Sequence, residues 1–139
     1  EAYLERFRLD GGQPIKDYSR GMRMKLNLAL AMSHHARLLI LDEPASGLDP
    51  VVRDDILDLF LDFVQDENHS ILVSSHITSD LEKIADYIVC IDGGRIVFDV
   101  KGKERRKMTV DDLLEKFREN AGKALDNDRI LLSKVEAGN

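Results

Sequence analysis

The chain has 139 residues, of which 43% are hydrophobic and 33% are charged, and its net charge is −6. These values are typical of about one soluble globular domain. The acidic balance argues against a general nucleic-acid binder, because such proteins need a basic face to displace counterions. The single cysteine, Cys90, excludes an internal disulfide framework, fits a reducing compartment and lies in an apolar run that predicts a buried side chain.

The first half of the chain predicts helices that alternate with one strand. Residues 1–9 read as the end of a helix, and apolar spacing predicts a second helix over about 19–34. The apolar run 38–41 predicts a parallel strand that is covered on both faces. Asp49 and Pro50 then supply an N-cap and a proline at the first position of the next helix.

The second half continues the alternation. Residues 70–74 predict a strand, and Ser79 with Glu82 forms a capping-box pattern that predicts the start of a helix. A strand over 87–91 and a Gly-Gly turn into 95–98 predict a hairpin.

A last amphipathic helix is expected after the cap formed by residues 109–112, with Val110, Leu113, Leu114 and Phe117 facing inward. The whole pattern predicts an α/β fold with a mostly parallel sheet, flanked by helices, and a C-terminal hairpin. In such sheets, ligands bind at the carboxyl ends of the strands.

Three ionisable residues follow two of these strands. Asp42 and Glu43 come directly after the first strand, and His76 follows the second. Asp42 is suited to hold a hard divalent ion such as Mg²⁺, and Glu43 to polarise a water for attack on a phosphoryl group. The alternative is purely structural, because acidic strand ends are common and a lone histidine is more often structural.

The start of the helix after Ser19 indicates an anion partner. Arg20, Arg23 and Lys25 place cations at the positive end of the helix dipole, where they cost stability unless an anion lies opposite. Ser19 as the cap and Gly21 without a Cβ leave this end open to a phosphate. The alternative is a surface helix that tolerates basic residues.

Four motifs in a fixed order resemble the ABC ATPase family. They are Tyr18–Met22, Leu38–Pro44, Ser46–Pro50 and Ser75–His76, and the resemblance covers residues 18 to about 98. It implies the C-terminal half of a P-loop NTPase (RecA-like) ABC ATPase domain. ATP and Mg²⁺ are the implied cofactors.

The resemblance also implies a role for each motif. Tyr18–Met22 is similar to the signature motif, which contacts the terminal phosphate of ATP bound to the opposite subunit. Arg20 stands for the usual glycine and Met22 for the usual glutamine, so the expected contacts fall on Ser19 and Gly21.

The other three motifs complete the implied site. Asp42 is similar to the Walker B magnesium residue and Glu43 to the catalytic base. Asp49 lies in the D-loop at the dimer seam, besides its expected N-cap role, and His76 corresponds to the switch histidine that senses the terminal phosphate.

The P-loop pattern Gly-x-x-x-x-Gly-Lys-Ser/Thr, which cradles phosphates, is missing from the sequence. The two Gly-Lys pairs, at Gly102 and Gly122, lack both the glycine five positions upstream and the hydroxyl residue after the lysine. The chain also begins without methionine. We therefore expect a fragment of a longer ATPase, from the signature motif onward, that does not hydrolyse ATP alone and exposes apolar sheet surface.

Two regions are expected within this fragment. Residues 1–100 form the ATPase part, with a helical signature region over about 1–35 and a sheet core over about 36–100. Residues 101–139 form a basic linker and a C-terminal helical extension.

The expected function is the ATP-hydrolysing subunit of an ABC membrane transporter. Its partners are then a second ATPase subunit, with ATP at the interface, and an integral membrane subunit, with no nucleic acid. No apolar run approaches the roughly 20 residues of a membrane span, and no signal peptide is evident. The resemblance to ABC ATPases implies a location on the cytoplasmic face of the plasma membrane. The alternatives are an ABC-type ATPase acting on nucleic acid or ribosomes, and a non-catalytic binding remnant.

Overall fold

The computed structural model describes residues 2–102, 107–121 and 130–136. Three helical segments open the chain: α1 (Ala2–Arg6), the 3-10 helix η1 (Ile15–Asp17) and α2 (Arg20–Ser33). Strands and helices then alternate as β1 (Leu38–Asp42), α3 (Pro50–Phe63), β2 (Ser70–Ser75), α4 (Thr78–Ile84) and β3 (Tyr87–Asp92). The last elements are β4 (Arg95–Lys101), α6 (Val110–Ala121) and β5 (Ile130–Glu136).

The five strands form one mixed sheet in the order β1-β2-β5-β3-β4. Strands β1 and β2 pair in parallel, and β3 runs in the same direction, because β5 is antiparallel to both β2 and β3. The β3–β4 hairpin turns at Gly93 and Gly94, whose φ angles of 55° and 74° suit glycine. The predicted α/β class and the hairpin are confirmed, whereas β5 in the middle of the sheet was not expected.

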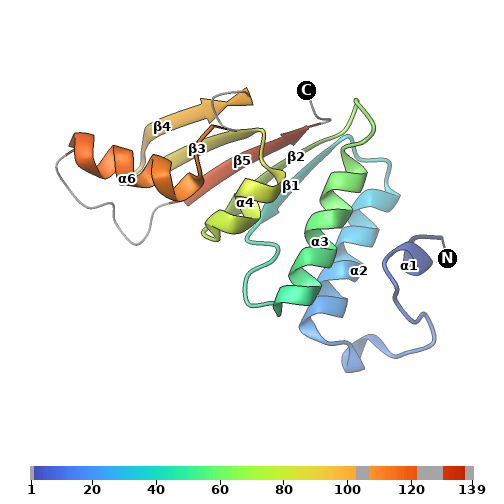
Figure 1. Cartoon of the computed structure of the whole chain (residues 1–139). Coiled ribbons are helices and arrows are strands. Elements are labelled where there is room, and N and C mark those ends of the chain that lie inside the picture. Colours follow the sequence, from blue (N-terminus) through green and yellow to red (C-terminus); the bar gives the residue numbers. More distant parts are fainter. Residues whose placement is uncertain (1, 103–106, 122–129, 137–139) are drawn as a thin grey trace.

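Helices α2, α3, α4 and α6 lie on one side of the sheet (Figure 1). The core lies between the two layers, where Ile56 and Phe60 of α3 pack with Ile71 of β2 and Ile88 of β3, all four with 0% exposure. Cys90 is also fully buried, as predicted.

Strand β1 is not covered on both faces, so that prediction was wrong. Leu39 is buried toward the helices, but Leu38 is 53% exposed and Ile40 is 72% exposed. The reason is that side chains alternate along a strand, and in the described part of the chain β1 is an edge strand with helices on one side only.

The predicted capping box of Ser79 and Glu82 does not form, whereas the predicted cap at residues 109–112 does. Helix α4 has Ile77 at its N-cap without a side-chain bond, and Glu82 instead accepts from the backbone N–H of Val110 at 2.7 Å. A tertiary contact with α6 thus replaces the predicted local one. At the start of α6, the N–H of Asp112 donates to Thr109 Oγ1 at 3.0 Å, and the N–H of Thr109 donates to Asp112 Oδ2 at 3.1 Å. The predicted cap at residues 109–112 is thereby confirmed.

Val110 and Leu114 of α6 are buried as predicted, whereas the side chain of Phe117 lies outside the described residues.

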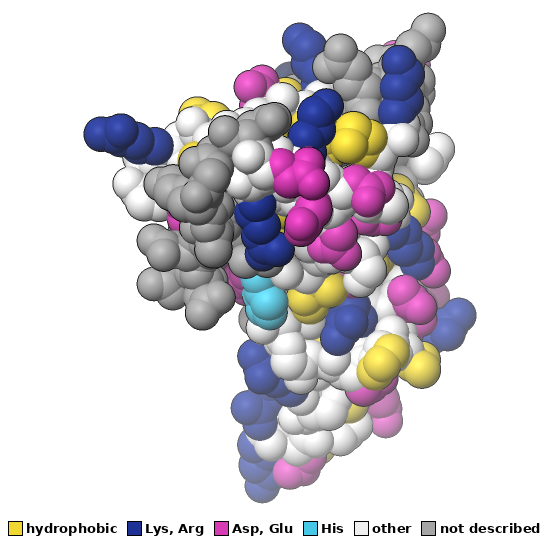
Figure 2. Space-filling view, turned by 60° about the vertical axis from the view of Figure 1, so that its left-hand side comes forward, with side chains coloured by type: hydrophobic (Ala, Val, Ile, Leu, Met, Phe, Trp, Pro, Cys, Tyr) yellow, Lys and Arg dark blue, Asp and Glu magenta, His cyan; other side chains and the backbone are white. Residues whose placement is uncertain are grey.

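Figure 2 shows a group of acidic side chains with lysine and arginine side chains around it, so charges of both signs share this face. No helix among the described residues is long and apolar enough to cross a bilayer.

Candidate functional site

Asp42 ends β1 beside Ser74 of β2, because the two strands pair in parallel register at these positions. The Ser74 hydroxyl donates a hydrogen bond to Asp42 Oδ1. Carboxylate and hydroxyl oxygens are ligands suited to Mg²⁺, which usually takes one or two carboxylates and completes its shell with water and phosphate. Within the described ranges, no three or more His, Cys, Asp or Glu side chains gather in a metal-binding group. One carboxylate and one hydroxyl are a donor set that suits Mg²⁺ only if water or other oxygen ligands complete its shell.

Glu43 leaves the strand with a left-handed backbone, φ 48°, which costs a non-glycine residue about 1–2 kcal/mol. Its N–H donates to both the carbonyl oxygen and the Oγ of Ser74, each at 3.1 Å. These two bonds hold the turn in place. Strained backbone of this kind is common at functional sites.

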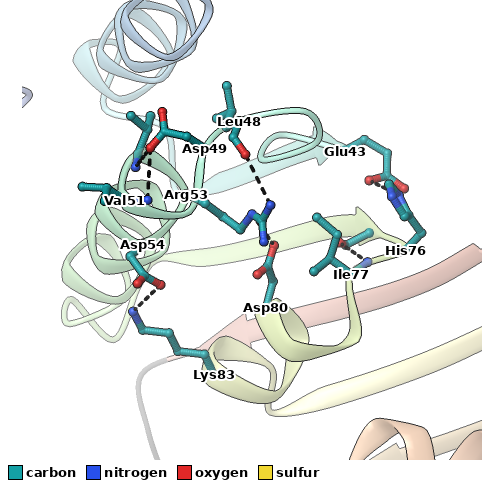
Figure 3. Close-up of polar contacts among 12 residues, drawn as sticks. Glu43, Leu48, Asp49, Val51, Arg53, Asp54, His76, Ile77, Asp80 and Lys83 are labelled. Atoms are coloured by element: carbon teal, nitrogen blue, oxygen red, sulfur yellow. Dashed lines mark hydrogen bonds and ion pairs between the residues drawn. The ribbon is translucent and has the colours of Figure 1, made fainter.

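Glu43 and His76 meet at this turn. Glu43 Oε2 lies 2.9 Å from His76 Nδ1, and their side chains are 36% and 62% exposed (Figure 3). The contact is within hydrogen-bonding distance and accessible from solvent. The structure thus brings Asp42, Glu43 and His76 to one edge of the sheet, as expected from the carboxyl ends of β1 and β2.

Ser19, Gly21 and Asp49 form a second group at the N-termini of α2 and α3. Ser19 Oγ accepts from the N–H of Met22 at 3.1 Å, and Asp49 Oδ1 accepts from two N–H groups of α3, also at 3.1 Å each. Both predicted N-caps are thereby present. Gly21 is buried against Val52, where a Cβ would lie 2.5 Å from Val52 Cγ1, so glycine allows the two helix ends to pack closely.

The loop of residues 44–49 connects the two groups. Gly47 in this loop has φ 70°, and a Cβ there would lie 2.5 Å from Nη1 of Arg20. The side chain of Arg20 therefore covers Gly47. The residue that departs from the family's usual signature glycine thus packs on the loop that follows Glu43.

Sequence reasoning missed three polar residues here. Ser74 could have been found by aligning Asp42 with the neighbouring strand in parallel register. Arg53 donates through Nη2 to the carbonyl oxygen of Leu48 at 3.3 Å, and its Nε lies 3.9 Å from Oδ2 of the buried Asp80. No motif pointed to this pair. Burial raises the pKa of the Asp80 carboxyl, and the charge of Arg53 opposes this effect.

Comparisons with known proteins identify the family. A family model described as "AAA domain, putative AbiEii toxin, Type IV TA system" matches residues 3–79, which is more than half of the chain. A solved structure titled "An inward-facing conformation of a putative metal-chelate type ABC transporter" matches with a TM-score of 0.65 and 21% identity, over 96% of this chain and 54% of that one. This structural likeness shows the fold.

Several curated proteins share more sequence identity with this chain than that solved structure does. The lantibiotic transport ATP-binding protein SrtF of Streptococcus pyogenes is 38% identical over 63% of this chain and 38% of its own length. The bacitracin transport ATP-binding protein BcrA of Enterococcus faecalis is 40% identical over 67% of this chain and 30% of its own length. The uncharacterized ABC transporter ATP-binding protein YdbJ of Bacillus subtilis is 37% identical over 62% of this chain and 28% of its own length. The chain thus spans less than half the length of these relatives.

The chain belongs to the AAA-domain family that this model describes. Within that class, the predicted resemblance to the ATP-binding proteins of ABC transporters is confirmed.

Proposed function

We propose that this chain is the part of an ABC transporter's ATP-binding subunit that runs from the signature motif onward. ATP binds with Mg²⁺ between two such subunits, and an integral membrane subunit is the further partner. The intact protein then lies on the cytoplasmic face of the plasma membrane. The observation that supports this proposal best is the Glu43–His76 contact of 2.9 Å next to the Asp42–Ser74 pair.

We assign each of these residues a role that its position supports. Asp42 would hold the Mg²⁺, which when bound would supply positive charge to offset that of the phosphates. Glu43 accepts the proton of the attacking water, and His76, hydrogen-bonded to Glu43, contacts the terminal phosphate. Ser19 and Gly21 present the N-terminus of α2 to the phosphate of ATP held by the second subunit, and Asp49 lies at the seam between them.

The test uses the protein that joins this chain to a P-loop half. Glu43→Gln removes the proton acceptor but keeps the size of the side chain, so we expect ATP turnover to fall at least about 100-fold with ATP binding retained. Glu67→Gln, in the exposed turn after α3, is the matched control and should leave turnover unchanged. Turnover in Glu43→Gln equal to that of the control would contradict the proposal.

The 139 residues alone should not release phosphate from Mg²⁺-ATP, because they carry no P-loop to hold the β- and γ-phosphates. A phosphate-release assay on the purified chain measures this directly. Steady turnover that Glu43→Gln abolishes would show that the site works without a P-loop half.

A further inference from the structure

Arg53 and Asp80 form a buried ion pair between α3 and α4 (Figure 3). The Asp80 side chain is only 7% exposed, and Arg53 is 26% exposed. Asp80 also lines a cavity of about 10 Å³ whose other walls include the apolar side chains of Leu57, Phe60 and Ile84. The carboxyl group therefore sits in surroundings that disfavour its charge.

The pair is a weak source of stability. Arg53 Nε and Asp80 Oδ2 are both buried without a hydrogen-bond partner within the described residues, and they are 3.9 Å apart. Removing two charges from water is costly, and this cost is recovered only where good hydrogen bonds form. An apolar pair of similar size would serve the core as well. Stability alone therefore does not account for these two residues.

The position of the pair suggests another role. Arg53 also binds the carbonyl oxygen of Leu48, in the loop 44–49 that directly follows Glu43. Asp80 lies in the first turn of α4, and its N–H donates to the carbonyl oxygen of Ile77, the residue after His76. Arg53 thus contacts the loop that follows Glu43 and also pairs with the first turn of α4, which follows His76.

We propose that Arg53 and Asp80 are positioning residues that fix the loop 44–49 against the start of α4 and thereby set the contact between Glu43 and His76. This inference rests on the proposed function for its consequence in catalysis. The side chain of Arg20, at the start of α2, also packs on Gly47 of the same loop. Through this loop, the phosphate-facing end of α2 is linked to His76.

A second ion-pair system provides a matched control. Lys83 of α4 bonds Asp54 at 3.4 Å and Asp58 at 3.0 Å, both on α3 (Figure 3 shows the bond to Asp54). It joins the same two helices, but Lys83 is 37% exposed and the carboxylates are 69% and 66% exposed. No bond from Lys83 to the loop 44–49 is seen among the described residues.

The experiment compares Asp80→Asn, Arg53→Lys and Lys83→Met in the 139-residue chain without nucleotide. We expect Asp80→Asn to speed hydrogen exchange at the amides of Ser46 and Leu48 about tenfold and to shift the NMR signals of the His76 ring. Arg53→Lys keeps the charge and the fold, and should give a smaller change of the same kind. Lys83→Met should leave both readouts at their wild-type values. Unchanged readouts in Asp80→Asn, or equal changes in Lys83→Met, would overturn the inference.

The catalytic consequence is measured separately in the protein that joins this chain to a P-loop half. Asp80→Asn should lower kcat for ATP about tenfold with little change in KM, since the pair lies between α3 and α4 and is not among the residues proposed to bind the nucleotide. If Glu43→Gln leaves turnover intact, the proposed function fails whatever Asp80→Asn does. If Glu43→Gln abolishes turnover and Asp80→Asn changes neither exchange nor kcat, only the positioning role fails.

Discussion

Single residues in this protein combine a structural task with the expected chemistry. Ser74 accepts from the N–H of Glu43 and donates to Asp42, so one hydroxyl holds both acidic residues at the end of the sheet. Asp49 caps α3 with two hydrogen bonds, whatever contact it makes across a dimer seam. Gly21 allows α2 and α3 to pack closely, besides its proposed role at the start of α2.

Gly21→Ala provides a test at the scale of one residue. Alanine normally stabilises a helix relative to glycine by about 1 kcal/mol. Here the added methyl would lie 2.5 Å from Val52 Cγ1, and the branched valine has little freedom to move. We therefore expect a net loss of about 1–3 kcal/mol in the free energy of unfolding, measured with urea. The double variant Gly21→Ala/Val52→Ala should recover part of it, and a more stable Gly21→Ala protein would show that α2 and α3 do not pack this closely.

At the scale of elements, α2 and α3 are also joined by a bridge between Lys25 and Asp55, with Nζ 2.8 Å from Oδ2. The hydrogen bond from Lys25 holds the pKa of Asp55 below its ordinary value of 3.8. The unfolded chain therefore takes up a proton at this position more readily than the folded one. The bridge contributes its full stability above the ordinary pKa and loses it as the pH falls through the lower, folded value.

Asp55→Asn should accordingly reduce the stability at neutral pH. Asp55 is 38% exposed, so solvent screening limits the loss to about 1 kcal/mol or less. The difference from wild type should shrink as the pH drops below 3.8. Urea unfolding across this pH range measures it, with the exposed Asp17→Asn of η1 as the comparison. A difference independent of pH would mean that the charge of Asp55 does not matter.

At the scale of the whole molecule, the sheet has helices on one side only among the described residues (Figure 1). Leu38 and Ile40 expose apolar side chains on the other side of the edge strand β1. An apolar surface beside an unpaired strand edge favours association. The exposed apolar sheet surface expected from the sequence is therefore present at β1.

The isolated chain should associate in a concentration-dependent manner through this surface. Ile40→Lys places a charge on the edge strand and should lower the associated fraction at least about twofold in sedimentation velocity. Ile15 is 60% exposed in η1, so Ile15→Lys makes the same change elsewhere and should have little effect. Equal association in both variants would locate the contact outside β1.

Much of the fold could be predicted because its signals are local. The caps Ser19 and Asp49 fix where α2 and α3 begin, and Gly93 with Gly94 fixes the hairpin, all through bonds or dihedral angles within a few residues. Strand direction alone predicts that Asp42, Glu43 and His76 gather at one end of the sheet, where β1 and β2 have their carboxyl ends. The assigned roles of these residues and the boundary near residue 100 stay predictions.

The sequence by itself thus determined the order of the elements from α2 to α6, most of their ends and the end of the sheet that carries the candidate site. Only the tertiary structure decided the place of β5 between β2 and β3, the open face of β1 and the partners of Glu82, Arg53 and Asp80. These features join residues far apart in the chain, and their energies depend on which surfaces pack together. No short pattern of residues encodes that choice.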